Sequence, residues 1–261
     1  MTCKNKVPTL SIVIATFNSA ITIKRALDSV INQKYKDWEC IIVDGFSQDD
    51  TIKIVKEYAE KEHRITYISE PDNGIYDAFN KGWKLSSGKW IYYLGSDDYL
   101  TNDGLYNLLK DSSDVDCLYG GVYRIAYNNL YVKKEPFKNS IALGTMISHQ
   151  AMLMQKKHIE RMNGFDLQYK VSADFDLVTR SIISGARFEM RPYYIAYFSS
   201  GGACSSMLPI KEASKILYMN RVLTKKQAKV RYCKRYVRNL YWIYVKWPIG
   251  KIYLEIKKMI K

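Results

Sequence analysis

Four short apolar runs alternate with helical stretches over about the first 100 residues, and this alternation constrains the fold more than any other feature of the sequence. The runs are rich in β-branched residues and almost continuously apolar, which is typical of strands that are covered on both faces. They occupy residues 10–15, 38–43, 65–69 and 90–94. Between them, apolar residues recur at helical spacing over residues 20–33, 50–60 and 75–85. The pattern predicts an α/β fold with a Rossmann-like sheet flanked by helices.

The pattern is looser in the second half of the chain. It predicts a short helix and two antiparallel strands, over residues 105–109, 117–126 and 131–133. We therefore expect the sheet to become mixed. From about Pro209 the spacing is mostly helical, and Pro248 interrupts it before a last short helix. These features predict one α/β domain, residues 1–208, and a mostly helical extension, residues 209–261.

Polar or aromatic residues follow three of the four predicted strands at the point where each strand ends. Thr16, Phe17 and Asn18 follow the first strand, Asp44 follows the second, and Ser96, Asp97 and Asp98 follow the fourth. The carboxyl ends of parallel strands meet at one edge of the sheet, and ligands of open α/β sheets bind at that edge. We expect one crevice lined by all three clusters.

Two of these positions carry adjacent carboxylates. Asp97 and Asp98 offer hard oxygen ligands for Mg²⁺ or Mn²⁺, and such ions typically lie between protein carboxylates and substrate phosphates. The alternative is a structural turn, because Asp-Asp pairs are common in turns and at helix N-caps.

Asp44 and Phe17 are candidates for holding a nucleoside. A buried aspartate at a strand end can accept hydrogen bonds from a planar base or a ribose, and Asp44 precedes the next helix by too many residues to cap it. Phe17 would give the base a stacking face, although a lone phenylalanine is more often part of a core.

Five sequence blocks resemble family 2 glycosyltransferases in their order and spacing. They are SIVIATFN, IIVDGFSQDDT, SEPDNGIYDAFNKG, WIYYLGSDD and GFDLQYKVSADFDLVTR. The resemblance covers about the first 200 residues and is strongest to members used in bacterial surface-polysaccharide assembly, of the colanic-acid and capsule type. It implies a GT-A fold, with a nucleotide-binding part over about residues 1–100 and an acceptor part over about residues 101–208.

The resemblance also implies roles for individual residues. The nucleotide sugar would be bound by Thr16, Phe17, Asn18, Asp44, Asp72, Asn73, Asn80, Ser96 and Asp97. A divalent metal, Mn²⁺ or Mg²⁺, would be held by Asp98 and Asp97. The family often has an acid at the first position of its three-residue acidic motif, where this chain has Ser96. Asp98 is therefore the stronger candidate metal ligand and Asp97 the ribose partner, with diphosphate oxygens and water completing the coordination. UDP is the expected nucleotide.

Asp174 is the candidate catalytic residue. It aligns with the acid that serves inverting members of the family as general base, where one carboxylate suffices to deprotonate the acceptor hydroxyl. The family commonly has Glu-Asp here, and this chain has Ala173-Asp174. The alternative is that Asp174 caps the helix that follows.

Two further pairs of residues, His149-Gln150 and Gly201-Gly202, have weaker signals. His149 and Gln150 match a segment near the acceptor side in similar enzymes, although a solitary histidine is more often structural. Gly201-Gly202 resembles a loop that closes on the nucleotide sugar, but such a pair is also ordinary turn chemistry.

The net charge of +14 is concentrated near the C-terminus. Residues 221–261 contain thirteen of the 40 Lys and Arg residues. Of the 26 acidic residues, this segment contains Glu255 alone. Tyrosines and tryptophans interleave with these cations, a composition that favours an anionic membrane surface over nucleic acid. The alternative is that this tail packs on the catalytic domain or pairs two subunits as a homodimer.

The cysteines and the hydropathy pattern indicate a cytoplasmic enzyme on the inner face of the cell membrane. The five cysteines are scattered and never form a CxxC pair, so we expect reduced thiols rather than a disulfide framework or a zinc site. No signal peptide and no apolar stretch of about 18 residues is apparent.

Two other classes of protein compete with a glycosyltransferase. A sugar nucleotidyltransferase of related architecture usually has a glycine-rich basic loop after the first strand, and the segment after Ala15 contains neither Gly nor Lys. A non-catalytic basic protein would not need carboxylates at one sheet edge, since they repel phosphate in the absence of a metal. We therefore predict an inverting glycosyltransferase that transfers sugar from a nucleotide-diphosphate sugar to a saccharide or to a lipid-linked (polyprenyl-diphosphate) saccharide.

Overall fold

The computed structural model describes residues 7–110, 114–125, 131–134, 147–199 and 207–241. The chain forms two compact units, Met1–Gly202 and Ala203–Lys261, which are considered separately. The predicted glycine pair Gly201-Gly202 and the predicted helix after Pro248 lie outside the described residues.

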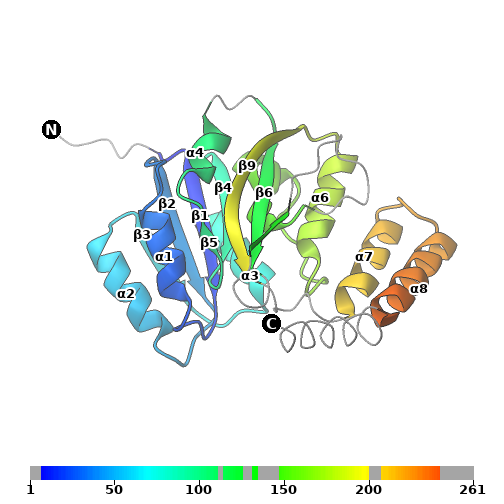
Figure 1. Cartoon of the computed structure of the whole chain (residues 1–261), viewed down its shortest axis with the longest axis horizontal. Helices are drawn as coiled ribbons and strands as arrows, with labels where there is room; N and C mark the ends of the chain where they lie inside the picture. Colours follow the sequence, from blue (N-terminus) through cyan, green and yellow to red (C-terminus); the bar gives the residue numbers. More distant parts are fainter. Residues whose placement is uncertain (1–6, 111–113, 126–130, 135–146, 200–206, 242–261) are drawn as a thin grey trace, which may run out of the picture. The chain divides into compact units, whose positions relative to one another are not determined.

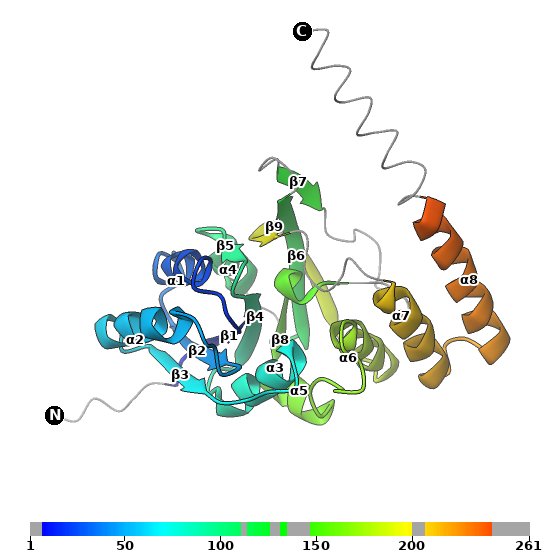
Figure 2. The same ribbon diagram turned by 90° about the horizontal axis from the view of Figure 1, so that it is seen from below.

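The first half of the first unit is an open parallel sheet, as predicted. Its strands are β1 (Leu10–Thr16), β2 (Trp38–Asp44), β3 (Ile65–Ser69) and β4 (Trp90–Gly95), in the spatial order β3-β2-β1-β4. The connecting helices are α1 (Ile23–Ile31), α2 (Thr51–Lys61) and α3 (Ile75–Leu85). The chain moves from β1 outward to β3 and then returns to β4, so right-handed crossovers place α1 and α2 on one face and α3 on the other (Figures 1 and 2).

Burial follows the predicted pattern in three of these strands and departs from it in the fourth. β1 and β4 are buried along their whole length, and β2 nearly so. In β3, Thr66, Tyr67 and Ser69 are exposed. The expectation that residues 65–69 are covered on both faces was wrong, because β3 is the edge strand and pairs with β2 alone.

The sheet continues as a mixed sheet, as predicted. Its further strands are β5 (Tyr99–Leu100), β6 (Cys117–Ile125), β7 (Tyr131–Lys134), β8 (Met152–Gln155) and β9 (Phe188–Ser199). β8 lies antiparallel between β4 and β6 (Figure 2), and β9 runs parallel to β6 (Figure 1). The described part of this unit also contains the helices α4 (Gly104–Leu109), α5 (Lys156–Arg161) and α6 (Ala173–Ile183) and a 3₁₀ turn (His149–Ala151). Because β8 inserts beside β4, residues 149–151 enter next to the ends of the parallel strands.

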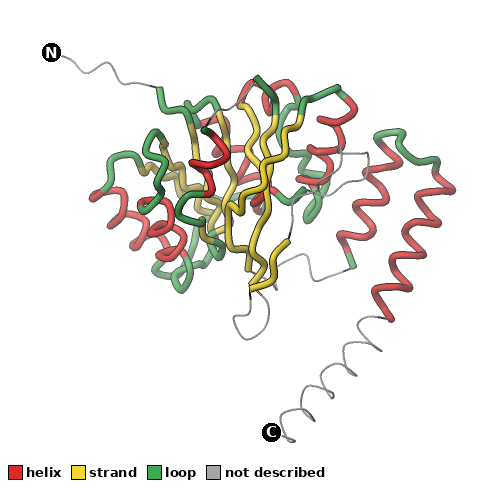
Figure 3. The backbone as a smooth tube through the Cα atoms, turned by 45° about the horizontal axis from the view of Figure 1, so that its top comes forward, coloured by secondary structure: helices red, strands yellow, loops and turns green. Residues whose placement is uncertain are grey.

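The described part of the second unit is helical. It consists of α7 (Leu208–Met219) and α8 (Lys225–Tyr241), which pack against each other (Figure 3). The helix α8 carries seven Lys and Arg residues, and of its side chains only that of Ala228 is buried. Val237 and Cys233, which lie four residues apart on α8, are both exposed. No helix in the described ranges is long and apolar enough to cross a membrane.

Candidate active site

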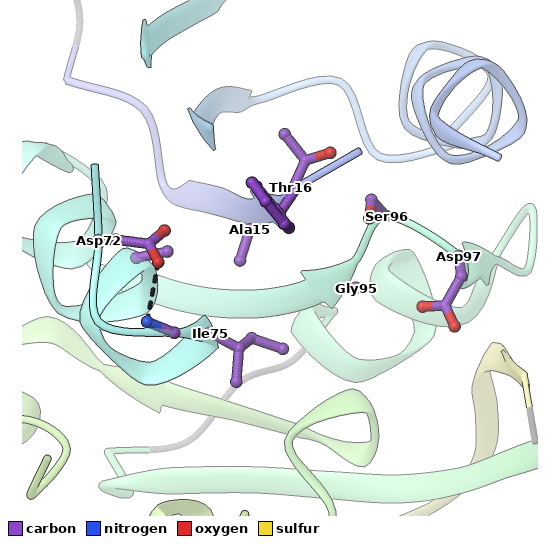
Figure 4. Close-up of a pocket in the computed structure, with 10 residues that line it drawn as sticks. Ala15, Thr16, Asp72, Ile75, Gly95, Ser96 and Asp97 are labelled. Carbon is purple, nitrogen blue, oxygen red and sulfur yellow. Dashed lines mark hydrogen bonds between the residues drawn. The ribbon is translucent and has the colours of Figure 1, made fainter. Parts of the chain in front are cut away.

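A pocket of about 300 Å³ opens where β1 and β4 end, at the start of α3 (Figure 4). It is lined by Ala15, Thr16, Phe17, Asp72, Gly74, Ile75, Ala78, Gly95, Ser96 and Asp97. The register explains the convergence, because Thr16 pairs with Asp44 and Ala15 pairs with Gly95 in neighbouring parallel strands. The structure thus brings together at the predicted edge five of the residues expected from sequence, namely Thr16, Phe17, Asp72, Ser96 and Asp97.

Asn18 does not line the pocket but joins the loops after β1 and β2. Its backbone N–H donates to Ser47 Oγ at 2.8 Å, and its side-chain Oδ1 accepts from Gln48 N at 2.9 Å. Asn18 has φ 46°, a left-handed conformation that asparagine tolerates better than most residues. This junction leaves the neighbouring ring of Phe17 60% exposed at the pocket.

Asp44 lies behind the same loops and is completely buried. Its carboxylate accepts hydrogen bonds from Ser47 N at 3.0 Å, Ser47 Oγ at 2.5 Å and Ser69 Oγ at 2.6 Å. These bonds tie the ends of β2 and β3 together. A nucleobase would reach this carboxylate only if a serine hydroxyl gave up its bond.

Of the residues in the segment before α3, some line the pocket and others do not. Asp72 lines the pocket, and its Oδ1 accepts from Gly74 N at 2.8 Å, the bond drawn in Figure 4. Gly74 has φ 108°, which favours glycine at this turn. Asn73 points its amide to Asp77 Oδ2 at 3.3 Å and does not line the pocket.

Asn80 lies on another side of α3. Its Nδ2 donates to the carbonyl of Phe165 at 2.8 Å, and its Oδ1 accepts from Phe165 N and Trp83 Nε1, both at 2.9 Å. It lines a different hollow with Gly164 and Phe165. The structure therefore does not bring Asn80 to the pocket at the ends of β1 and β4, and its contacts anchor the turn before α6.

Asp98 is 2% exposed and has two hydrogen-bond donors. Ser199 N donates to Oδ1 at 2.8 Å and Gln150 Nε2 donates to Oδ2 at 3.0 Å. Burial, and next the charge of Asp97, raise the pKa of Asp98 to about 6. The charged form of this carboxylate is therefore electrostatically costly.

Asp97 differs from Asp98 because its side chain is exposed. Its backbone carbonyl accepts from Arg25 Nη2 and from Ser199 Oγ, both at 2.7 Å, so the turn is held while the carboxylate stays in solvent. Ser96, where the family often has an acid, forms a hydrogen bond of 2.8 Å between its Oγ and that of Ser19. This bond couples the ends of β1 and β4.

The carboxylates of Asp97 and Asp98 fit a divalent metal as part of a shared site. A Cβ atom on Gly95 would stand 3.0 Å from Asp97 Oδ1 and 3.0 Å from Asp98 Oδ2, so both carboxylates flank one small space that a larger residue would fill. Among the described residues no three His, Cys, Asp or Glu side chains gather around a common point. Mg²⁺ and Mn²⁺ accept such a sparse protein set when substrate phosphates and water supply the other oxygens.

Asp174 lies in the first turn of α6 and is buried. The helix N-cap position is Ser172, so Asp174 is not the cap. Its Oδ1 accepts from Tyr76 Oη at 3.1 Å and from Phe175 N at 2.8 Å, while Oδ2 lies 3.4 Å from His149 Nδ1. The positive end of the helix dipole favours a carboxylate at this position.

His149 and Gln150 connect the two acidic centres. His149 lies against Asp174, and the next residue, Gln150, donates to Asp98. Tyr92 Oη donates to the carbonyl of Gln150 at 2.9 Å and fixes the turn from β4. His149 Nε2 is buried and has no hydrogen-bond partner among the described residues. The predicted acceptor-side pair thus lies between Asp98 and Asp174.

Three residues of this site were not predicted from the sequence. Tyr76 lies within the block GIYDAFNKG, so the motif was a signal, but its partner Asp174 is 98 positions away. Ser199 and Arg25, which hold the turn of Asp97 and Asp98, belong to no motif that we could recognise.

Two solved structures share the fold of this chain. The fold is shared with Staphylococcus aureus TarS 1-349 in complex with UDP-GlcNAc, at TM-score 0.69 and 18% identity, over 89% of this chain and 72% of that one. It is also shared with the mannosyltransferase PcManGT of Pyrobaculum calidifontis, solved with GDP-Man and Mn²⁺, at TM-score 0.66 and 16% identity, over 85% and 66% of the two chains. The fold is therefore the GT-A fold of glycosyltransferases.

The sequence comparison identifies the family. The profile of glycosyl transferase family 2 matches residues 11–168, more than half of the chain. A PGL/p-HBAD biosynthesis glycosyltransferase of Mycobacterium bovis is 29% identical over 224 residues, which cover 82% of this chain and 85% of that protein. This chain belongs to glycosyltransferase family 2, which confirms the family and the fold predicted from the sequence.

Proposed function

We propose that this glycosyltransferase inverts the anomeric configuration as it transfers a sugar from a nucleotide-diphosphate sugar to a saccharide or lipid-linked saccharide. One observation carries the proposal: adjacent residues of the 149–151 turn contact the buried carboxylates of Asp98 and Asp174. One short segment beside the strand-end pocket therefore contacts both the proposed donor-binding acid and the candidate base.

The donor is expected to be a UDP-sugar in the pocket at the ends of β1 and β4. The exposed ring of Phe17 offers a stacking face, and the backbone of the β4 turn brings Asp97 to the same pocket. TarS, which shares the fold, has been solved with UDP-GlcNAc. Uracil recognition by Asp44 would require one of its serine bonds to open.

Asp97 and Asp98 are proposed to hold Mn²⁺ or Mg²⁺ together with the donor diphosphate. The bound cation would neutralise charge on the diphosphate. The fold relative PcManGT was solved with Mn²⁺, which supports this assignment.

Asp174 is proposed to act as the general base. As the acceptor oxygen bonds to the anomeric carbon, the hydroxyl proton passes to the carboxylate. The bond from the anomeric carbon to the diphosphate oxygen breaks, and the nucleoside diphosphate leaves with that electron pair. Tyr76 and Phe175 N occupy Oδ1, so Oδ2 is the atom available to the acceptor, with His149 beside it. Attack by the deprotonated acceptor oxygen from the face opposite the leaving group gives inversion.

Tyr76→Phe is expected to lower kcat for sugar transfer by about tenfold, because a hydrogen bond to a charged group contributes roughly 1.5–3 kcal/mol. KM for the donor should stay nearly unchanged, since Tyr76 does not line the donor pocket. Tyr58→Phe is the matched control, because Tyr58 Oη also donates to a carboxylate, that of Asp28, at 2.5 Å and away from the site. Equal kcat losses in the two variants would show that Tyr76 has only a structural role.

The helix α8 is proposed to attach the enzyme to the inner face of the cell membrane, where a polyprenyl-diphosphate-linked acceptor would be available. Val230, Val237 and Tyr241 are exposed and recur at intervals of seven and four residues, so they form one face of α8. Arg231 Nε is buried without a hydrogen-bond partner among the described residues. Burial, and next the charge of Arg235, lower the pKa of Arg231.

Neutralising three of these cations in the full chain, by Arg231→Gln, Lys234→Gln and Arg235→Gln together, is expected to reduce binding to anionic vesicles by about tenfold or more. Each basic residue near such a surface contributes on the order of 1 kcal/mol. The control carries the same change in charge at exposed positions of the first unit, Lys24→Gln, Lys53→Gln and Lys56→Gln. Co-sedimentation with vesicles of phosphatidylserine and phosphatidylcholine measures the difference. If both triple variants sediment like the parent, α8 does not bind membrane.

The proposed reaction is tested first by thermal shift with a panel of nucleotide sugars, with and without Mn²⁺. A donor at about 100 times its Kd should stabilise the folded state by about 2.7 kcal/mol. The configuration of the transferred sugar, measured by NMR, then tests inversion. A preference for a nucleoside triphosphate with a sugar phosphate would instead indicate a nucleotidyltransferase.

A further inference from the structure

A second hollow, of about 470 Å³, lies in the first unit between the segment after β5 and the strand β9. One side is polar and contains Asn102, Asp103 and Asn107, and the other contains Tyr123, Tyr194 and Tyr197. It shares no lining residue with the pocket at the ends of β1 and β4. It is therefore a separate site.

The aromatic side belongs to a row of four stacked tyrosines. Tyr197 pairs with Tyr99 in β5 and with Tyr123 in β6, and the ring centroids are 4.6 and 4.9 Å apart. Tyr194 stacks on the other face of Tyr123 at 4.5 Å, because register shifts near Gly121 bring it into line. All four rings are half-buried rather than buried in the core. Such rings offer apolar surface and hydroxyl groups at the same time.

This row leads back to the active site. The Arg25 guanidinium lies 4.5 Å from the centroid of the Tyr99 ring and also donates to the carbonyl of Asp97. Tyr99 directly follows Asp98 in the chain. The hollow at one end and the candidate metal site at the other are thus joined by packed side chains.

The backbone on the polar side of the hollow is fixed in place, but three of its side chains have no hydrogen-bond partner among the described residues. Thr101 Oγ1 donates to the carbonyls of Tyr194 and Ile195 at 2.8 and 3.0 Å, which fixes the segment against β9. Within the described residues, the side chains of Asn102, Asp103 and Asn107 form no hydrogen bond with another group. Two amides and a carboxylate provide both donors and acceptors at a solvent-filled hollow.

We propose that this hollow is a second saccharide-binding site, which takes a neutral sugar unit. Paired donors and acceptors match the vicinal hydroxyl groups of a pyranose, and tyrosine side chains match its apolar C–H face. The carboxylate of Asp103 disfavours a phosphorylated or acidic ligand. The role of the site rests on the proposed function, because it would retain a glycan acceptor through a sugar distant from the reacting hydroxyl.

The test begins with the full-length protein on an array of neutral oligosaccharides, and saturation-transfer NMR then measures the affinity of the strongest ligand. Asn107→Ala should weaken that ligand at least tenfold, and Asp103→Asn should weaken it less. Asn32→Ala is the matched control, since Asn32 is exposed, lines neither pocket, and forms no side-chain hydrogen bond with the part of the chain that the structure describes. UDP affinity, measured on the same variants, should be unchanged.

Each outcome bears on one proposal. Saccharide binding that is weakened by Asn107→Ala and unaffected by saturating UDP supports the second site. Absence of any binder on the array, equal affinity in Asn107→Ala and Asn32→Ala, or competition by UDP would overturn it. Binding of a single-stranded oligonucleotide in place of a saccharide would overturn it as well. If the parent protein does not bind UDP, the proposed donor is contradicted, independently of the saccharide result.

Discussion

Asp174→Asn is expected to slow sugar transfer by about 100-fold or more while the donor binds nearly as in the parent enzyme. General-base catalysis typically contributes 10²–10⁴-fold. An amide has almost the same shape as the carboxylate, and its oxygen can still accept from Tyr76 and Phe175 N, so the first turn of α6 should persist. What the variant loses is the basicity of Oδ2, the oxygen that lies 3.4 Å from His149 Nδ1.

The measurement combines single-turnover transfer rates with UDP titration and thermal unfolding. Asp166→Asn is a suitable control, because Asp166 lies before α6, bonds to Gln168 and does not line the donor pocket. We expect the control to transfer sugar at the parental rate. Full transfer activity in Asp174→Asn, with a competent acceptor, would reduce Asp174 to a structural member of the helix.

Asp98→Asn is expected to remove most of the metal dependence of donor binding. A neutral amide is a poorer ligand for a hard divalent ion, and the loss in metal-dependent UDP affinity should be at least about tenfold. This substitution also has a structural cost. The carboxylate accepts one bond at each oxygen, from Ser199 N and from Gln150, whereas an amide has one acceptor oxygen and would face one donor with its NH₂ group.

A second variant separates these two effects. Asp97→Asn changes an exposed carboxylate, so it should leave the melting temperature unchanged and still weaken the response to Mn²⁺. Calorimetric titration of UDP with and without Mn²⁺ compares both variants with the parent. If Asp98→Asn and Asp97→Asn both keep the parental difference between the two titrations, the metal is not held by this pair.

Much of the nucleotide-binding half could be predicted from the sequence, because its signals are local. Apolar runs with β-branched residues and helical spacing between them depend on neighbouring positions alone, so the strands and helices of the first 95 or so residues were predicted to within a few residues. The placement of polar residues after each strand is equally local. Once strands are parallel, their carboxyl ends must meet, and Thr16, Ser96 and Asp97 do line one pocket.

The same local signals could not reveal which partner each side chain would find. Asn80 and Asp72 belong to one block of sequence, yet α3 turns Asn80 toward Phe165 and leaves Asp72 at the pocket. Asp44 ends its strand as predicted, but Ser69 of the neighbouring strand completes its bonds. A helix has several faces, and the end of a strand has several neighbours. A block of sequence therefore predicts the region in which its residues lie, but not which side chains they contact.

The sequence by itself determined the α/β order, the edge of the sheet where the pocket opens and the acids that stand there. Only the tertiary structure decided how those acids are held: Ser199 reaches Asp98 across 101 positions, and Tyr76 reaches Asp174 across 98. The first contact follows from the antiparallel pairing of β9 with β5, in which Tyr197 lies opposite Tyr99. Such contacts form when segments that are distant in the sequence pack into one sheet. The periodicity within a segment does not encode which other segment becomes its neighbour.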